Sequence, residues 1–114
     1  MPQKNLLSKD PPYEVAVALR ELGSNLRTAR LRRRITMEDA AERIGTGVRA
    51  VRDAEAGKPT TSIAVYYALL WLYGLILDAR TVASPIKDEE GLKLAMSREP
   101  KIARAARGGM DNDF

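Results

Sequence analysis

The chain has 114 residues, 45% of them apolar and 30% charged, with 19 Lys and Arg against 15 Asp and Glu and a formal net charge of +4. This length and composition predict one globular domain with a single core, and argue against a disordered or membrane-spanning protein. Because Cys and His are absent, disulfides, zinc fingers and imidazole or thiol catalysis are excluded, and we expect no enzyme, no metal and no cofactor.

The first twelve residues are polar and end in Asp10-Pro11-Pro12, a sequence that cannot lie inside a helix. We therefore expect residues 1–12 to form a flexible arm. This segment lacks the apolar stretch of a secretory signal, which predicts a cytoplasmic protein. Residues 1–34 hold eight basic and three acidic residues, a balance of +5, and such a basic excess favours a polyanionic partner.

A helix is predicted from Glu14, despite Gly23, because apolar residues recur at steps of four and three: Val15, Leu19, Leu22, Leu26 and Ala29. Arginines then gather at its end, where cations complement the carbonyl end of the helix dipole. They are Arg27, Arg30, Arg32, Arg33 and Arg34. The same cluster is equally consistent with a solvated basic end.

Two short helices follow. Thr36 and Asp39 have the spacing of a capping box, and apolar residues follow at one-face spacing until Gly45 ends the segment: Met37, Ala40, Ala41 and Ile44. The second short helix is predicted over residues 47–56 and ends at Gly57, with its apolar side made by Val48, Val51 and Ala54.

The most apolar stretch, residues 63–77, predicts a further helix that buries one side in the core and meets another surface with the opposite side. Its aromatic residues are expected to serve the core and a homodimer contact rather than to stack on bases: Tyr66, Tyr67, Trp71 and Tyr73. An amphipathic helix is expected over residues 88–97, before Pro100, and a basic tail follows it. Asp88, Glu89 and Glu90 are expected to complement the start of that helix rather than to act as a catalytic cluster.

Two short helices joined by a Gly-containing turn, with a longer helix on each side, are typical of a helix-turn-helix domain. The second short helix can enter a DNA major groove only if the other helices pack behind it, and small residues between the helices permit a close crossing. The sequence thus predicts an all-α fold of four to five helices. Its expected division is a domain over residues 13–80 and a short C-terminal helix with a tail over residues 81–114.

A specific pattern lies within residues 22–75: Leu26, Arg30, ITMEDAA from Ile35 to Ala41, Gly45 and VRDAEAG from Val51 to Gly57. This pattern resembles the Xre, or lambdoid-repressor, type of helix-turn-helix domain, in which ITMEDAA is usually LTQEELA. It implies an ion pair between Arg30 and Glu55. It also implies base-contacting positions at Gly47, Val48, Arg49, Arg52 and Asp53, and phosphate-contacting positions at Met37, Arg43, Lys58, Arg33 and Arg34.

The segment from Pro59 to Leu75, together with the tail, is more narrowly similar to HipB-like antitoxins. This similarity implies a bacterial homodimer that represses its own operon by binding double-stranded DNA at an inverted repeat and that binds a HipA-type kinase toxin. Partner contacts in the tail would then fall on Arg104, Arg107 and Phe114. Two alternatives stay open: a phage or plasmid repressor without a toxin, and a protein adaptor that has lost DNA binding. The adaptor is favoured by Met37, which stands where the family usually has a Gln that contacts a phosphate, and by Gly47, which stands where a polar cap residue is usual.

Overall fold

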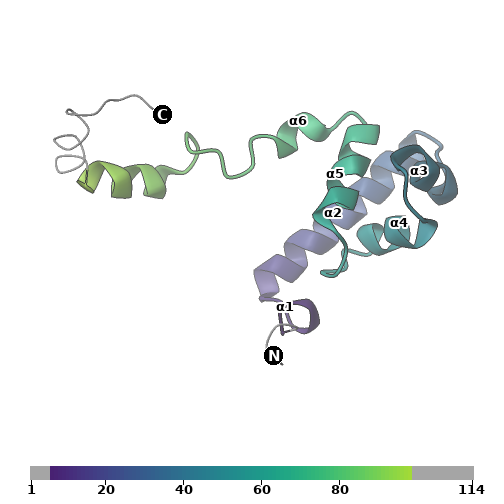
Figure 1. Ribbon diagram of the computed structural model, residues 1–114, viewed down its shortest axis with the longest axis horizontal. Helices are drawn as coiled ribbons and strands as arrows, with labels where there is room; N and C mark the ends of the chain where they lie inside the picture. Colours follow the sequence, from purple (N-terminus) through teal and green to yellow (C-terminus); the bar gives the residue numbers. More distant parts are fainter. Residues whose placement is uncertain (1–5, 99–114) are drawn as a thin grey trace. The chain divides into compact units, whose positions relative to one another are not determined.

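The computed structural model describes residues 6–98, and every regular element in that part of the chain is helical (Figure 1). The predicted all-α fold class is therefore confirmed. The labelled helices are α1 (Leu6–Lys9), α2 (Tyr13–Arg32), α3 (Met37–Ile44), α4 (Val48–Glu55), α5 (Ile63–Leu72) and α6 (Ile76–Ala79). A further helix occupies residues 89–98.

The chain divides into two compact units, Met1–Arg80 and Thr81–Phe114. In the second unit, the helix of residues 89–98 begins after Asp88, whose carboxylate accepts a hydrogen bond of 3.0 Å from the Gly91 amide. This bond satisfies one first-turn amide that has no partner within the helix. The apolar residues Leu92, Leu94 and Met96 of this helix are exposed.

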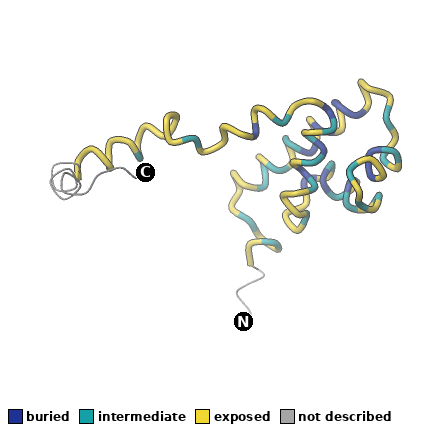
Figure 2. The backbone as a smooth tube through the Cα atoms, turned by 45° about the horizontal axis from the view of Figure 1, so that its top comes forward, coloured by how far each residue is buried: buried dark blue, intermediate teal, exposed yellow. Residues whose placement is uncertain are grey.

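The core of the first unit lies where α2, α3, α4 and α5 meet, and the buried residues gather there in Figure 2. Its largest fully buried side chains come from three helices: Leu26 from α2, Val51 from α4, and Tyr66 and Leu69 from α5. α3 contributes the two small residues Ala40 and Ala41. Their size lets α3 pack closely against its neighbours, as the sequence pattern predicted.

The boundaries of α3 follow the predicted signals. The Thr36 hydroxyl accepts a hydrogen bond of 3.0 Å from the Asp39 amide, which is the first half of the predicted capping box. The Asp39 carboxylate is bonded to Arg43 instead of completing that box. At the other end Gly45 adopts φ +83°, and the amide of Thr46 donates to the Ala41 carbonyl at 2.9 Å. This is a Schellman turn, which requires the left-handed conformation that glycine adopts without strain.

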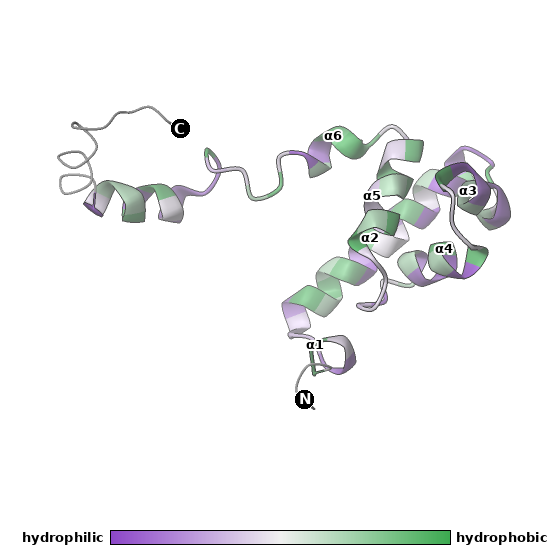
Figure 3. Cartoon of the chain, in the orientation of Figure 1, coloured by the Kyte–Doolittle hydropathy of each residue, from purple (hydrophilic) through white to green (hydrophobic). Residues whose placement is uncertain are grey.

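Within the expected N-terminal arm, residues 6–9 form the short helix α1. One expectation about elements was wrong. The helix predicted over residues 63–77 is two helices, because α5 ends at Leu72 and α6 begins at Ile76. Gly74, at φ +77°, makes the break, and the Leu75 amide donates to the Leu70 carbonyl at 2.7 Å in a second Schellman turn. Apolar residues lie on both sides of this turn, in the green segments of α5 and α6 in Figure 3, so periodicity alone could not locate it.

Candidate nucleic-acid interface

α4 presents one side to the core and the other to solvent. Val51 and Ala54 are fully buried beneath it, while Arg49 and Arg52 are exposed. α3 precedes α4 across the turn of residues 45–47 and packs against it. α2 and α5 also pack against α4. The pair α3–α4 thus has the arrangement of a helix-turn-helix, with the second helix exposing two guanidinium groups.

A buried ion pair fixes the end of α4 to α2. Arg30 Nε lies 2.6 Å from Glu55 Oε2, and Arg30 Nη2 donates to Oε1 at 3.0 Å, with 8% and 4% of the two side chains exposed. Arg30 Nη1 also donates to the Ile35 carbonyl at 2.9 Å, so the same guanidinium holds the connection between α2 and α3. The hydrogen bonds to Glu55 raise the pKa of Arg30, although burial acts in the opposite direction. Removing one partner of such a pair leaves an uncompensated buried charge and costs about 3–5 kcal/mol.

Two glycines bring the backbones of α2 and α4 together beside this ion pair. A Cβ on Gly23 of α2 would lie 2.6 Å from the carbonyl oxygens of Ala54 and Glu55, and a Cβ on Gly57 would lie 2.7 Å from the Leu19 carbonyl oxygen. These distances are shorter than any side chain can accept. Gly23, which looked unfavourable inside a helix, is therefore the residue that permits α4 to sit directly on α2.

The predicted base-contacting residues all lie along α4 or at its start. Gly47 is the extended N-cap residue of the helix, and Val48 packs partly against the core. Arg49 and Arg52 have exposed side chains without an ion pair among the described residues. Asp53 is half-buried and lies 3.5 Å from Lys58 Nζ. The two arginines are therefore available for a ligand, whereas Asp53 already has a partner.

The predicted phosphate-contacting residues fall into different environments. Met37 packs against the core, and Arg43 pairs with Asp39 at 3.0 Å on the exposed side of α3. Lys58 is exposed beside Asp53. Arg34 is exposed and has a left-handed backbone with φ +55°. Arg34 and Arg43 therefore precede α4 in the sequence and Lys58 follows it, and each carries a positive charge. Met37 carries none.

Arg33 serves the fold. Its Nη1 donates to the Ala29 carbonyl and its Nη2 to the Tyr73 carbonyl, both at 2.9 Å, and the guanidinium lies 5.7 Å from the centre of the Tyr73 ring. The side chain thereby links the ends of α2 and α5. Sequence reasoning treated it like its neighbour Arg34, because two adjacent arginines at a helix end look the same until the backbone direction is known.

A shallow groove runs between α4 and the start of α5, and sequence reasoning did not identify it as part of the site. Arg49 and Asp53 line it from α4, and the hydroxyl residues Thr60, Thr61 and Ser62 line it from the opposite side. Ser62 also begins α5, since its hydroxyl accepts a hydrogen bond of 3.0 Å from the Ala64 amide. The only signal in the sequence was a run of hydroxyl residues after Lys58, which indicated a turn.

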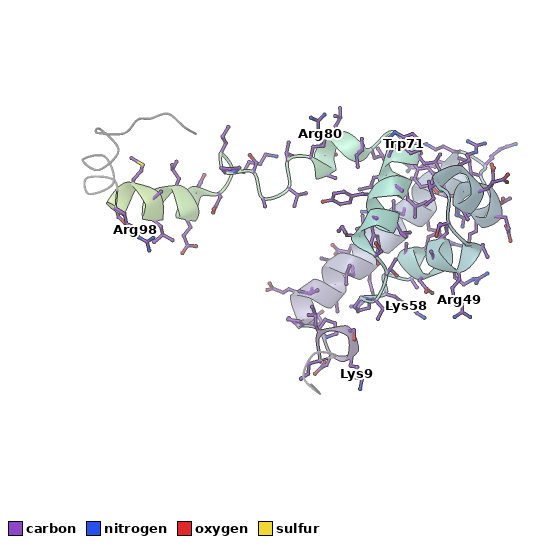
Figure 4. All side chains as sticks on the ribbon, viewed as in Figure 1. Lys9, Arg49, Lys58, Trp71, Arg80 and Arg98 are labelled. Carbon is purple, nitrogen blue, oxygen red and sulfur yellow. The ribbon has the colours of Figure 1, made fainter. Side chains whose placement is uncertain are left out.

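The aromatic residues of α5 separate into two groups. Tyr66 and Tyr73 are buried, and burial raises the pKa of each phenol, with the Glu55 carboxylate adding to the effect at Tyr73. Tyr67 and Trp71 are 38% and 61% exposed. In Figure 4, Trp71 lies away from Arg49 and Lys58, near the other end of α5. The predicted tail contacts Arg104, Arg107 and Phe114 lie outside the described residues.

The fold and this surface define a helix-turn-helix protein whose second short helix carries two exposed arginines. In agreement with this class, a family model described as "Helix-turn-helix domain" matches residues 21–82, and the chain belongs to that family. The assignment indicates a DNA-binding regulator. Searches of curated proteins and of solved structures found no significant match. Within residues 6–98, no helix has the length and apolar character needed to cross a bilayer.

Proposed function

We propose that the protein is a cytoplasmic, non-enzymatic repressor that reads double-stranded DNA with α4. The observation that carries the proposal is the pair of exposed guanidinium groups, Arg49 and Arg52, on a helix whose end is fixed by the Arg30–Glu55 ion pair. An arginine can donate two hydrogen bonds to guanine O6 and N7, and each such contact discriminates by about 1–3 kcal/mol against another base.

The test is selection of binding sites from a pool of random duplexes, followed by titration of the Arg49→Ala variant. We expect the parent to select a defined site and the variant to lose discrimination at one guanine while keeping most of its non-specific affinity. Arg80→Ala is the matched control, because it removes one exposed cation from the end of α6. If Arg49→Ala and Arg52→Ala both select the same site as the parent, α4 does not read the bases.

The proposed operator is an inverted repeat, because the repressor is proposed to be a homodimer. Ile63, Tyr67 and Trp71 follow one another every four residues on α5, and each is exposed. A second copy packed against these residues would remove a large apolar surface from water. A two-fold dimer would place its recognition helices about 34 Å apart, one turn of the duplex.

The operon context follows from the similarity of residues 59–75 and of the tail to HipB-like antitoxins. We propose that the dimer represses its own operon and binds a HipA-type kinase toxin. Co-purification from the native operon region tests this directly. A kinase retained together with salt-sensitive operator binding supports the antitoxin, whereas operator binding without a partner indicates a phage or plasmid repressor.

One observation favours a second candidate, an adaptor that keeps the fold without the DNA contact. Of the five predicted phosphate-contacting side chains, Met37 packs against the core and Arg33 is bonded to two backbone carbonyls. The surface therefore offers fewer phosphate contacts than the resemblance implied. An adaptor would retain its protein partner and show no salt-dependent duplex binding, so the same titration separates the two candidates.

A further inference from the structure

The turn after α4 places opposite charges at two positions that the equivalent turn after α5 fills with apolar residues. In the turn after α4, the Lys58 amide donates to the Asp53 carbonyl at 3.1 Å. In the turn after α5, the Leu75 amide donates to the Leu70 carbonyl in the same way. This backbone bond brings the two side chains of each turn together. After α5 they are both leucines, whereas after α4 they form the ion pair between Asp53 and Lys58. The charges are therefore not required by the turn itself.

This ion pair lies at the edge of the candidate DNA-reading surface. Asp53 lines the same groove as Arg49, which precedes it by one helical turn, and the hydroxyl residues at the start of α5 line the opposite side. Lys58 Nζ is 3.5 Å from the Asp53 carboxylate, and 58% of the Lys58 side chain is exposed. A pair with this exposure is weak and can open when either partner gains a better contact.

We propose that Asp53 withholds Lys58 from non-specific DNA and releases it when a cytosine amino group bonds to the Asp53 carboxylate. This inference rests on the proposed function. A carboxylate facing phosphates or the acceptor edges of bases is repelled, so on an unselected duplex Lys58 stays with Asp53 and neutralises it. A cytosine N4 amino group is the donor that a carboxylate reads in the major groove. When it replaces Lys58, the ammonium group is free to contact a phosphate.

The release of Lys58 can be measured from the salt dependence of binding. Each phosphate contact steepens the slope of log K against log[salt] by about 0.9. The first probe is a random-sequence duplex of about 30 bp, long enough for two half-sites one turn apart, titrated between about 50 and 200 mM KCl. We expect Asp53→Asn to bind it more tightly than the parent and with a slope steeper by about 0.9 per bound subunit. Lys58→Gln and the double variant should both keep the parent's slope, because neither has an additional free cation.

The second probe is the duplex selected by the parent. On it the parent should show a slope steeper by about 0.9 per subunit than on the random duplex, and this difference should vanish in Asp53→Asn and in Lys58→Gln. Glu90→Gln removes one negative charge, as Asp53→Asn does, but in the second unit. It should leave the slopes on both duplexes unchanged. Circular dichroism and thermal melting check that each variant is folded.

The outcomes separate the inference from the function on which it rests. If the parent binds both duplexes but Asp53→Asn has the parent's slope on the random duplex, Lys58 is not withheld and the inference is wrong. A flatter slope for Lys58→Gln on the random duplex also overturns it, because Lys58 would then already contact phosphate. If the parent binds no duplex, the proposed function fails and the inference fails with it.

Discussion

Arg33 and Arg34 are both exposed residues, but the guanidinium of Arg33 is bonded to the carbonyls of Ala29 and Tyr73 and so links the ends of α2 and α5. We expect Arg33→Ala to lower the free energy of unfolding by about 1–3 kcal/mol, because hydrogen bonds from a charged group to two carbonyls are lost. Arg33→Lys should recover little, since one ammonium group cannot reproduce the planar fork and the ring contact. Urea denaturation measures both changes.

Arg34→Ala is the matched control for that experiment. It removes the same charge one residue later, and we expect its stability to stay within about 0.5 kcal/mol of the parent. Its duplex affinity should fall if Arg34 contacts a phosphate. Equal losses of stability for Arg33→Ala and Arg34→Ala would show that the bonds of Arg33 contribute nothing to folding.

Two buried phenols make the fold sensitive to alkali. Burial raises the pKa of Tyr66 and Tyr73 above the ordinary value of 10.0. In the unfolded chain these groups ionise at the ordinary value, so the unfolded state loses protons before the native state does. Stability is therefore fully present below pH 10 and is lost as the pH rises through the native pKa values. Chemical denaturation between about pH 8 and 11 should show this decline.

Phenylalanine substitutions separate the two contributions. The Tyr66 hydroxyl donates to the Lys58 carbonyl at 3.1 Å, whereas the buried Tyr73 hydroxyl has no hydrogen-bond partner among the described residues. Tyr73→Phe should leave stability at pH 7 unchanged or raise it, and Tyr66→Phe should cost about 1 kcal/mol. Each should weaken the alkaline decline. An undiminished decline in both variants would assign it to other groups.

At the scale of elements, the approach of α2 to α4 depends on Gly23. In an open helix, replacing Gly by Ala gains about 1 kcal/mol. Here the added Cβ would lie 2.6 Å from two carbonyl oxygens, and forcing the helices apart costs about 1–3 kcal/mol or more. We therefore expect Gly23→Ala to lower the melting temperature and to weaken duplex binding by displacing α4.

Gly47→Ser is the contrasting substitution. Gly47 begins α4 without a side-chain cap, and a Cβ there has nothing within 4 Å. A serine hydroxyl could accept a hydrogen bond from a first-turn amide, which would raise the free energy of unfolding by a few tenths of a kcal/mol. The two variants should thus shift the melting temperature in opposite directions. A melting temperature raised by Gly23→Ala would mean that the α2–α4 contact is looser than the distances indicate.

The sequence was informative where the signal is local. The Thr36 cap and the glycines after α3 and α4 are adjacent to the helix ends they define, so their spacing was enough. Gly74 is also local, but it lies inside an apolar run that masks the turn. The role of Gly23 could not be predicted, because its partner is the backbone more than 30 residues later.

The candidate site was predictable to the same degree. The outward positions of α4 could be placed by pattern and resemblance, and the structure brings Arg30 and Glu55 together at 2.6 Å. The functions of the flanking cations could not be separated, because Arg33, Arg34 and Lys58 differ only in what folding places beside them. The groove lined by Thr60, Thr61 and Ser62 likewise exists only after α5 has packed beside α4.

At the scale of the whole molecule, the exposed residues of α5 are the proposed homodimer contact. Trp71→Glu places a charge at a residue that is 61% exposed. A monomer should therefore keep its stability, whereas a dimer packed through this residue should dissociate. We expect sedimentation to show a shift from dimer to monomer, with operator affinity reduced. Ile86→Glu, at an apolar residue of the second unit that is 88% exposed, is the control. A parent that sediments as a monomer would contradict the dimer.

The contact of α4 with α2 also bears on how such a protein could change its target over time. Gly23 and Gly57 meet backbone atoms rather than side chains, so the angle of α4 is set by main-chain geometry. Substitutions on the outward side of α4 would leave that geometry intact. If α4 reads DNA as proposed, new DNA preferences could therefore arise by exchanging Arg49, Arg52 or Asp53 alone, without compensating changes in the core.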